Sequence, residues 1–276
     1  MTQDNKEFYV IGHPIKHSKS PIIHTHWFEQ YGIDAGYETF EIEPNNFDKD
    51  INHLKQNADG WNITLPYKQE MIPTLDKISK TAKEIGAVNT VYKKDDQLCG
   101  DNTDIVGIKK SLINHSDVKQ WSDKKALIIG AGGAARSACL ALKQMGVSSI
   151  YITNRTIEKA QNLKEEFDLD AVVNWDEVND NLSKFDVICQ MSSVGLKNET
   201  KLPFDFRALK ETCICFDAVY NPLETEFLKH ANAKGCVTID GLWMLLYQAA
   251  GAFELWFGFE PKIDTLLREK LSKDLL

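Results

Sequence analysis

An apolar run that breaks into a glycine cluster constrains this chain more than any other stretch. Residues 126–136 read ALIIGAGGAAR, and a helix-forming segment follows. A strand, a tight turn and a helix in this order, with G-x-G-x-x-A spacing, form the turn that holds the pyrophosphate of a dinucleotide. Gly130 permits the turn, and Gly132 lets the backbone approach the phosphates. A glycine-rich turn that serves packing alone is the alternative.

A regular series of short apolar segments begins at this turn. Strands are predicted over residues 126–129, 149–153, 171–174, 187–190, 213–217 and 237–239. Helical or loop segments separate them, so that consecutive strands are joined by crossover connections. Their number and spacing match a complete doubly wound, or Rossmann, dinucleotide-binding fold.

The first third of the chain also alternates strands with helices. Strands are predicted over 8–11, 37–42, 61–64, 88–92 and 98–100, and helices over 20–31, from 45 or 46 to 56, 79–85 and 103–114. Ser20 is placed to cap its helix, with Pro21 at the first helical position. Two further helices, over 241–257 and 261–271, follow the last Rossmann strand and are predicted to return to this first lobe.

We therefore expect a two-lobed α/β protein. Residues 1–105 and 241–276 would form a discontinuous, substrate-binding α/β domain, and residues 106–240 the Rossmann domain. The active cleft is expected between the two lobes, because ligands usually bind in such clefts.

Composition excludes several classes of function. The 276 residues carry a net charge of −8, which leaves no basic footprint for nucleic acid or anionic membranes. The polar N-terminus lacks the features of a signal peptide, and no apolar run is long enough to span a bilayer, so we expect a cytoplasmic protein. The six cysteines lack zinc-site spacing and are expected to be buried, reduced thiols, with no metal bound.

The residues after the second Rossmann strand bear on the choice of nucleotide. An acidic residue usually holds the ribose 2′-hydroxyl of NAD here, but this chain has Asn154, Arg155 and Thr156, with Lys159 one turn further. A guanidinium can clasp a 2′-phosphate, which an aspartate would repel. The pattern therefore favours NADP(H) over NAD(H), and a solvated helix cap is the alternative.

Polar residues gather at strand ends of the first lobe. The hydroxyls of Ser18 and Ser20 can converge on an anion such as a carboxylate, although capping alone would explain Ser20. Lys68 and Asp104 could supply a proton donor beside a ketone, with a surface ion pair as the alternative. Thr64 and Asn89 belong to motifs whose Asn, Thr and Asp side chains could hydrogen-bond a polyhydroxylated small molecule, although each alone is more often a turn or cap residue. Outside these motifs, Tyr220 follows a Rossmann strand and offers a phenol at the cleft, and Gln248 is a polar residue of an apolar helix that needs hydrogen-bond partners.

Taken together, these stretches resemble the shikimate dehydrogenase family over nearly the whole chain. The motifs, in order, are GHPIKHSKSP at 12–21, NITLPYK at 62–68, GAVNT at 86–90, GDNTD at 100–104, GAGGA at 130–134, NRT at 154–156 and MLLYQAA at 244–250. The resemblance implies NADPH-dependent reduction of 3-dehydroshikimate to shikimate in aromatic amino-acid biosynthesis, with hydride transfer to the C3 ketone.

The resemblance also implies residue roles. Lys68 would be the acid/base residue, paired with Asp104. The substrate would contact Ser18, Ser20, Thr64, Asn89, Asp104, Tyr220 and Gln248. The pyrophosphate would lie on Gly130, Ala131, Gly132, Gly133 and Ala134, the 2′-phosphate on Asn154, Arg155, Thr156 and Lys159, and the nicotinamide beside Ala218, Gly241 and Met244.

The chain departs from the family pattern at Thr25, Ile105 and Glu226, none of which is a proposed substrate contact. Two other functions fit the same scaffold. One is a quinate/shikimate dehydrogenase that uses NAD(P). The other is a non-catalytic metabolite sensor, which would be expected to lack Lys68 or Asp104. The sequence leaves the oligomeric state open between a monomer and a homodimer.

Overall fold

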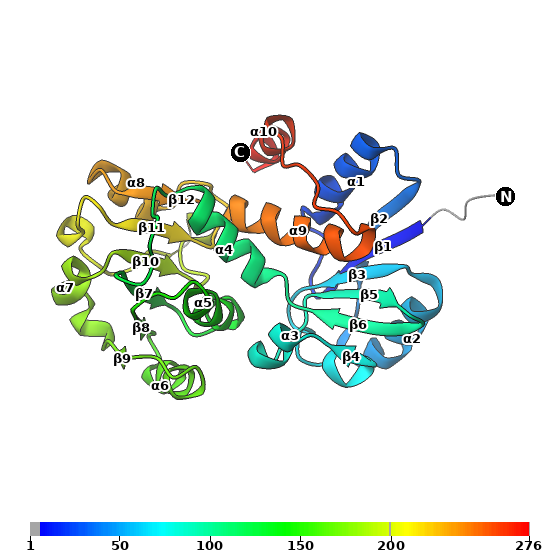
Figure 1. Ribbon diagram of the computed structural model, residues 1–276, viewed down its shortest axis with the longest axis horizontal. Helices are drawn as coiled ribbons and strands as arrows, with labels where there is room; N and C mark the ends of the chain where they lie inside the picture. The colour runs from blue at the N-terminus through cyan, green and yellow to red at the C-terminus, as the bar shows by residue number, and fades with distance from the viewer. Residues whose placement is uncertain (1–5, 199, 276) are drawn as a thin grey trace. The chain divides into compact units, whose positions relative to one another are not determined.

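The computed structural model describes residues 6–198 and 200–275, and the chain divides into two compact units. The first unit contains the residues up to Thr103 together with Gln248–Lys273, and the second contains Asp104–Tyr247 with the end of the chain. Each unit is built on its own sheet and is described by itself (Figure 1).

The second unit is built on a parallel sheet with the strand order β12-β11-β10-β7-β8-β9 (Figure 1). Its strands are β7 (Lys125–Ile129), β8 (Ser149–Thr153), β9 (Ala171–Val172), β10 (Val187–Gln190), β11 (Ile214–Asp217) and β12 (Val237–Ile239). The order runs outward in both directions from β7 and β10, which is the doubly wound arrangement. The glycine turn follows β7, at the carboxyl edge of the sheet, where ligands bind in such folds.

Helices and short turns connect these strands. The helices are α4 (Asp104–Asn114), α5 (Gly133–Gln144), α6 (Ile157–Glu166), α7 (Val178–Asn181) and α8 (Glu226–Ala233), and the 3₁₀ turns are Trp175–Glu177, Leu182–Lys184, Leu196–Asn198 and Phe206–Ala208. The central strands are apolar on both faces, as expected for a parallel sheet that is covered on both sides. Leu127, Ile129 and Ile188 belong to one core cluster with Phe206 and Phe227.

The first unit has a mixed sheet with the order β2-β1-β3-β5-β6-β4 (Figure 1). Its strands are β1 (Lys6–Gly12), β2 (Ala35–Glu41), β3 (Gly60–Ile63), β4 (Lys77–Ile78), β5 (Thr90–Lys94) and β6 (Gln97–Asp101). β1 pairs with β2 and β3 in parallel, whereas β5 is antiparallel to both β3 and β6. The helices are α1 (Ser20–Tyr31), α2 (Phe47–Asn57) and α3 (Lys80–Ile85), with 3₁₀ turns at Pro44–Asn46 and Ile72–Thr74.

The C-terminal helices, α9 (Gly241–Phe257) and α10 (Thr265–Asp274), bring the chain back to this sheet. The Trp256 indole donates a hydrogen bond to the carbonyl of Val91 in β5, at 2.9 Å. Phe253, further back on α9, packs edge-on against Trp27 of α1. An aromatic core therefore attaches the second half of α9 to the first unit, as the sequence predicted for the C-terminal helices.

The predicted fold class is confirmed, with corrections at element ends. The second C-terminal helix begins at Thr265 rather than 261, and β5 is displaced to Thr90–Lys94 from the predicted 88–92. The two-residue strand β4 was not predicted. Ser20 does not cap α1, because it is the first helical residue and Lys19 is the N-cap. The six cysteines, all in the described part of the chain, are free and buried.

The described residues contain neither a membrane-spanning helix nor a cluster of candidate metal ligands. Within residues 6–198 and 200–275, no helix is both long and apolar enough to cross a bilayer. The same residues contain no cluster of three or more His, Cys, Asp or Glu side chains placed to hold a metal ion.

Candidate active site

The glycine turn after β7 has one glycine that the protein itself requires. Gly130 has a φ of +115°, a conformation that L side chains rarely adopt. A Cβ on this residue would lie 3.0 Å from the backbone of Met191 and of Ser192. The Gly130 N–H donates to the carbonyl of Thr153 at 2.8 Å. Packing and dihedral angle together therefore account for Gly130.

The next two glycines have no such internal reason. Among the described residues, none places an atom within 4 Å of a Cβ built on Gly132 or Gly133. Gly132 also has a φ of −95°, which any residue can adopt. The space beside both positions is therefore open. Packing within the protein thus explains the first glycine of the motif only, and the role predicted for Gly132 and Gly133 in holding a pyrophosphate stays a prediction.

The turn between β8 and α6 carries the residues predicted to hold a 2′-phosphate. The Asn154 amide closes the turn by donating to the carbonyl of Thr156 at 2.8 Å. Arg155, Thr156 and Lys159 are exposed on this turn and on the first turn of α6. The two cationic side chains are thus accessible to a phosphate, and the sequence 154–156 contains no carboxylate that would repel it.

The structure brings Ala218 and Gly241, predicted to line the nicotinamide, into direct contact. A Cβ on Gly241 would lie 2.3 Å from the carbonyl oxygen of Ala218. The Gly241 N–H donates to the carbonyl of Val219 at 3.3 Å. The first turn of α9 therefore lies on the backbone that follows β11, and Met244 is one turn along the same helix.

Asp217, at the end of β11, is buried within this same region. Its carboxylate accepts hydrogen bonds from the Val219 N–H at 2.9 Å and from the Thr225 hydroxyl at 2.6 Å. Burial raises the pKa of Asp217 to about 7, although both hydrogen bonds act in the opposite direction. Burial also raises the pKa of Tyr220, so its phenol stays protonated at neutral pH.

In the first unit, Ser18 lies on the loop between β1 and α1, and Ser20 is the first residue of α1. The Ser20 N–H donates to the Ser18 hydroxyl at 3.3 Å, and the Ser18 N–H donates to the carbonyl of Ile15 at 3.0 Å. Ser20 is buried, and its side chain lies near the phenol of Tyr37, whose pKa burial raises. The two hydroxyls are therefore held close together.

Asn89 is the centre of a buried polar network. Its Oδ1 accepts hydrogen bonds from the Thr103 N–H at 2.8 Å and from the Thr90 hydroxyl at 2.9 Å. Its Nδ2 approaches Oε1 of Gln248 at 3.5 Å. Because backbone and hydroxyl donors occupy the oxygen, the orientation of the amide is set, and the NH₂ group faces Gln248. The Nδ2 atom also donates to the Thr103 hydroxyl at 3.1 Å, so both ends of the Asn89 amide are paired within the protein.

Asn62 connects this network to Tyr37, which lies near Ser20. Its Nδ2 donates to the Thr90 hydroxyl at 3.0 Å, and its Oδ1 accepts from the phenol of Tyr37 at 2.7 Å. Hydrogen bonds therefore run from Tyr37 through Asn62 and Thr90 to Asn89. Asn62, Thr90 and Thr103 all lie in motifs that the sequence analysis singled out, whereas nothing in the sequence marked Tyr37 as part of the site.

Thr64 and Lys68 lie on the segment that follows β3. The Thr64 N–H donates to the carbonyl of Ile11 at 2.9 Å, and the carbonyl of Lys68 accepts from the Val88 N–H at 2.8 Å. This hydrogen bond joins the Lys68 backbone to Val88, the residue before Asn89. Asp104 is the buried first residue of α4 and belongs to the second unit.

Comparison with known proteins shows which family this chain is similar to. Residues 10–91 match the family model described as shikimate dehydrogenase substrate binding domain, residues 113–200 that of shikimate / quinate 5-dehydrogenase, and residues 241–268 that of the shikimate 5′-dehydrogenase C-terminal domain. The chain is 41% identical to the shikimate dehydrogenase (NADP(+)) of Pelagibacter ubique, over 94% of this chain and 96% of the relative. The chain belongs to the shikimate dehydrogenase family.

Solved structures of this family agree with the two-unit fold. Shikimate 5-dehydrogenase from Thermus thermophilus, in complex with NADP(H) and shikimate, aligns with a TM-score of 0.87 at 34% identity, over 98% of this chain and all of that one. Quinate dehydrogenase from Corynebacterium glutamicum, in complex with NAD, aligns with a TM-score of 0.89 at 28% identity, over 97% and 99% of the two chains. The chain is thus an oxidoreductase of a family in which more than one substrate and cofactor occur.

The raised pKa of Asp217 makes a prediction about stability. The folded state binds more protons than the unfolded state between about pH 4 and 7, so stability falls as pH rises through this window. Asp217→Asn does not titrate and keeps an acceptor for the Val219 N–H. We expect its free energy of unfolding, relative to wild type, to rise from pH 4 to 7 by on the order of 3 kcal/mol, measured by urea unfolding.

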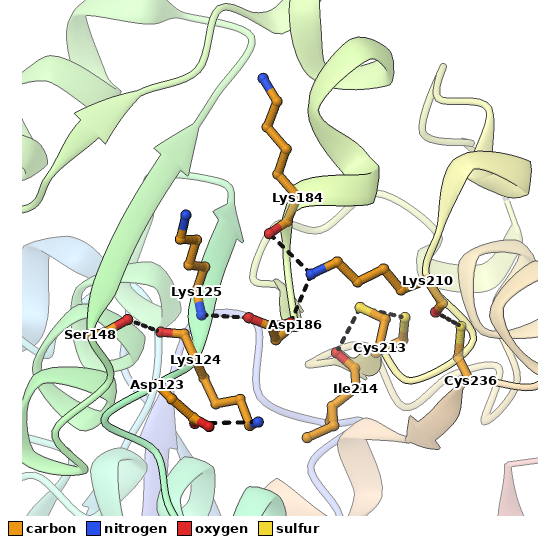
Figure 2. A network of polar contacts seen from close by, with 11 residues as sticks. Asp123, Lys124, Lys125, Ser148, Lys184, Asp186, Lys210, Cys213, Ile214 and Cys236 are labelled. Atoms are coloured by element: carbon orange, nitrogen blue, oxygen red, sulfur yellow. Dashed lines mark hydrogen bonds and ion pairs between the residues drawn. The ribbon is translucent and has the colours of Figure 1, made fainter.

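Asp186 provides a control of opposite sign. Burial alone would raise its pKa, but hydrogen bonds from the Lys210 ammonium and the Lys125 N–H lower it (Figure 2). Its contribution to stability is therefore present above the unfolded pKa and is lost in acid. Asp186→Asn should lose stability relative to wild type as pH rises, and equal slopes for the two variants would contradict the assignment of Asp217.

Proposed function

We propose that this chain is an NADP-dependent shikimate dehydrogenase that reduces 3-dehydroshikimate to shikimate in aromatic amino-acid biosynthesis. The likeness to enzymes of that name over nearly the whole chain carries the proposal. It is supported by the polar network of the first unit and by the glycine turn of the second, which supply the two kinds of binding group that the reaction needs.

The cofactor would be held by the second unit. The glycine turn, Gly130 to Ala134, would hold the pyrophosphate against the N-terminus of α5, and Asn154, Arg155, Thr156 and Lys159 would hold the 2′-phosphate. Ala218, Gly241 and Met244 would line the nicotinamide. Bound NADPH would supply the hydride that reduces the C3 ketone.

The substrate would be held mainly by the first unit. Ser18 and Ser20 would donate hydrogen bonds to its carboxylate, with Tyr220 nearby. Asn89, whose NH₂ group is directed by its neighbours, would donate to a ring oxygen, with Thr64 and Gln248 binding the other hydroxyls. A site built this way discriminates against analogues that leave its buried polar groups unpaired.

Lys68 would act as the general acid. Negative charge grows on the C3 oxygen as hydride adds, and the Lys68 ammonium would stabilise that charge and donate its proton to give the alcohol. The neutral amine would then recover a proton from water. Asp104 would orient Lys68 and accept a hydrogen bond from the adjacent hydroxyl.

Several predictions from the sequence form part of this proposal. These are the domain boundaries at residues 105 and 241, the cytoplasmic location, and the choice between monomer and homodimer. The second candidate function is a quinate/shikimate dehydrogenase that uses NAD(P), which the fold of the Corynebacterium enzyme favours. Arg155 argues against NAD as the main cofactor. The presence of Lys68 and Asp104 argues against a non-catalytic sensor.

Steady-state kinetics with both substrates and both cofactors test the function. We expect NADPH to be consumed with 3-dehydroshikimate. In the reverse direction, kcat/KM for shikimate with NADP should exceed that for quinate with NAD by at least about tenfold. A preference for quinate would favour the second candidate, and the absence of turnover with intact cofactor binding would favour a sensor.

The role of Lys68 predicts a loss of turnover. Lys68→Ala should lower kcat by roughly 10²–10⁴-fold, since this is the usual contribution of general acid catalysis. The KM for NADPH should stay within about twofold. Lys77→Ala, which removes an exposed lysine of β4 in the same unit, serves as the control. Near-normal turnover of Lys68→Ala would rule out this assignment.

The role of Arg155 predicts a change in cofactor preference. Arg155→Ala should raise the KM for NADPH by about 10–100-fold, which corresponds to the loss of a charge-assisted hydrogen bond to the 2′-phosphate. The weak use of NADH should hardly change. Arg207→Ala is the matched control, because the Arg207 Nε–H donates to Asp205 at 2.8 Å on a different surface turn of the same unit. An equal effect on both cofactors would make Arg155 a structural residue.

A further inference from the structure

Two wholly buried polar side chains end adjacent strands of the Rossmann sheet. Gln190 is the last residue of β10, Asp217 is the last residue of β11, and the two are register partners. Both have an exposure of 0%. Polar groups at such positions must find hydrogen bonds within the protein, and each of these finds them in the loop that follows its own strand.

Gln190 organises the segment 191–195. Its Nε2 donates to the carbonyls of Ser192 and Val194 at 3.1 and 2.8 Å. Its Oε1 accepts from the N–H and from the hydroxyl of Ser192 at 2.7 and 2.8 Å. Met191 and Ser192 of this segment are also the residues whose backbone lies against Gly130 of the glycine turn.

Asp217 and Thr225 organise the segment 218–225. Asp217 binds the two ends of this segment, through the Val219 N–H and the Thr225 hydroxyl. Thr225 is in turn the N-cap of α8 and accepts from the Leu228 N–H at 3.4 Å. Ala218, Tyr220 and the contact surface for Gly241 all lie within the segment closed in this way.

The two segments are also joined to each other. The Lys197 N–H, just after the first segment, donates to the carbonyl of Asn221 at 2.7 Å. A Cβ on Gly195 would lie 3.4 Å from the Thr225 methyl group, so the backbone there is in close contact with that side chain. One connected layer therefore lies at the carboxyl edge of the sheet. It contains the glycine turn, segment 191–195, segment 218–225 and the start of α9.

We infer that Gln190, Asp217 and Thr225 are positioning residues for hydride transfer, which hold the backbone layer on which the nicotinamide end of the cofactor would rest. The inference rests on the proposed function. Under the proposed function, affinity for the cofactor would come largely from the glycine turn and from Arg155 and its neighbours. Movement of segment 218–225 would therefore alter the geometry of the reacting ring more than the binding of the cofactor.

Thr225→Val tests this, since it removes the hydroxyl and keeps the shape of the side chain. We expect kcat to fall about tenfold, the KM for NADPH to stay within about twofold, and the primary isotope effect with NADPH deuterated at the transferred position to rise, because displaced reactants slow the hydride step. Thr225→Ser restores the hydroxyl and should recover most of kcat. A merely structural role would lower stability without raising the isotope effect.

Two further variants make the result decisive. Ser111→Ala removes another buried hydroxyl of the second unit, which donates to the carbonyl of Gly107 at 2.7 Å, and should leave kcat unchanged. Ser192→Ala removes one partner of Gln190 from the surface segment and should lower kcat about threefold, even where Thr225→Val fails to fold.

The outcomes separate this inference from the proposed function. An active wild type whose Thr225→Val and Ser192→Ala variants match Ser111→Ala in kcat and isotope effect would overturn the inference alone. A rise in KM for NADPH with unchanged kcat would also overturn it. A wild type that does not consume NADPH with 3-dehydroshikimate would overturn both.

Discussion

The parallel pairing of β7 with β10 is the interaction on which the second unit depends. It places the strand that precedes the glycine turn beside the strand that ends in Gln190, although the paired segments are far apart in sequence. At one edge of the sheet, Lys125 and Asp186, 61 residues apart, are joined by a hydrogen bond. At the other edge, Gly130 meets Met191 and Ser192. The shape of the glycine turn is therefore a tertiary property, set by a neighbouring strand as well as by local glycine content.

The first unit solves a different problem, the placement of polar side chains inside an apolar sheet. Asn62 and Asn89 each use both ends of their amide groups, and the Thr90 hydroxyl joins them. Buried amides that are fully paired have one orientation, because a flip would place donor against donor. The donors and acceptors of this network are therefore assigned before any ligand binds.

The sequence predicted the fold well where the residues of a strand or helix themselves mark its two ends. The strands of the Rossmann sheet and the apolar helix α9 were found almost residue by residue, because apolar runs and glycines mark them. The two-residue β4 was missed, since it exists only through its pairing with β6. Ser20 resembled a cap because local chemistry allows one, whereas in the structure it is the first residue of α1 and lies near Tyr37. Contacts of that kind join distant residues, and spacing does not reveal them.

The close contact at Gly130 also has a consequence for how the protein is made. The GAGGA motif is synthesised about sixty residues before β10, the strand that completes its surroundings. The entropic cost of closing a loop of that length comes before any gain from the contacts between β7 and β10. A nascent chain that ends before β10 therefore contains the motif without a finished nucleotide site. Because ligands stabilise only the state that binds them, a dinucleotide would select chains whose sheet is complete and would give no support to shorter ones.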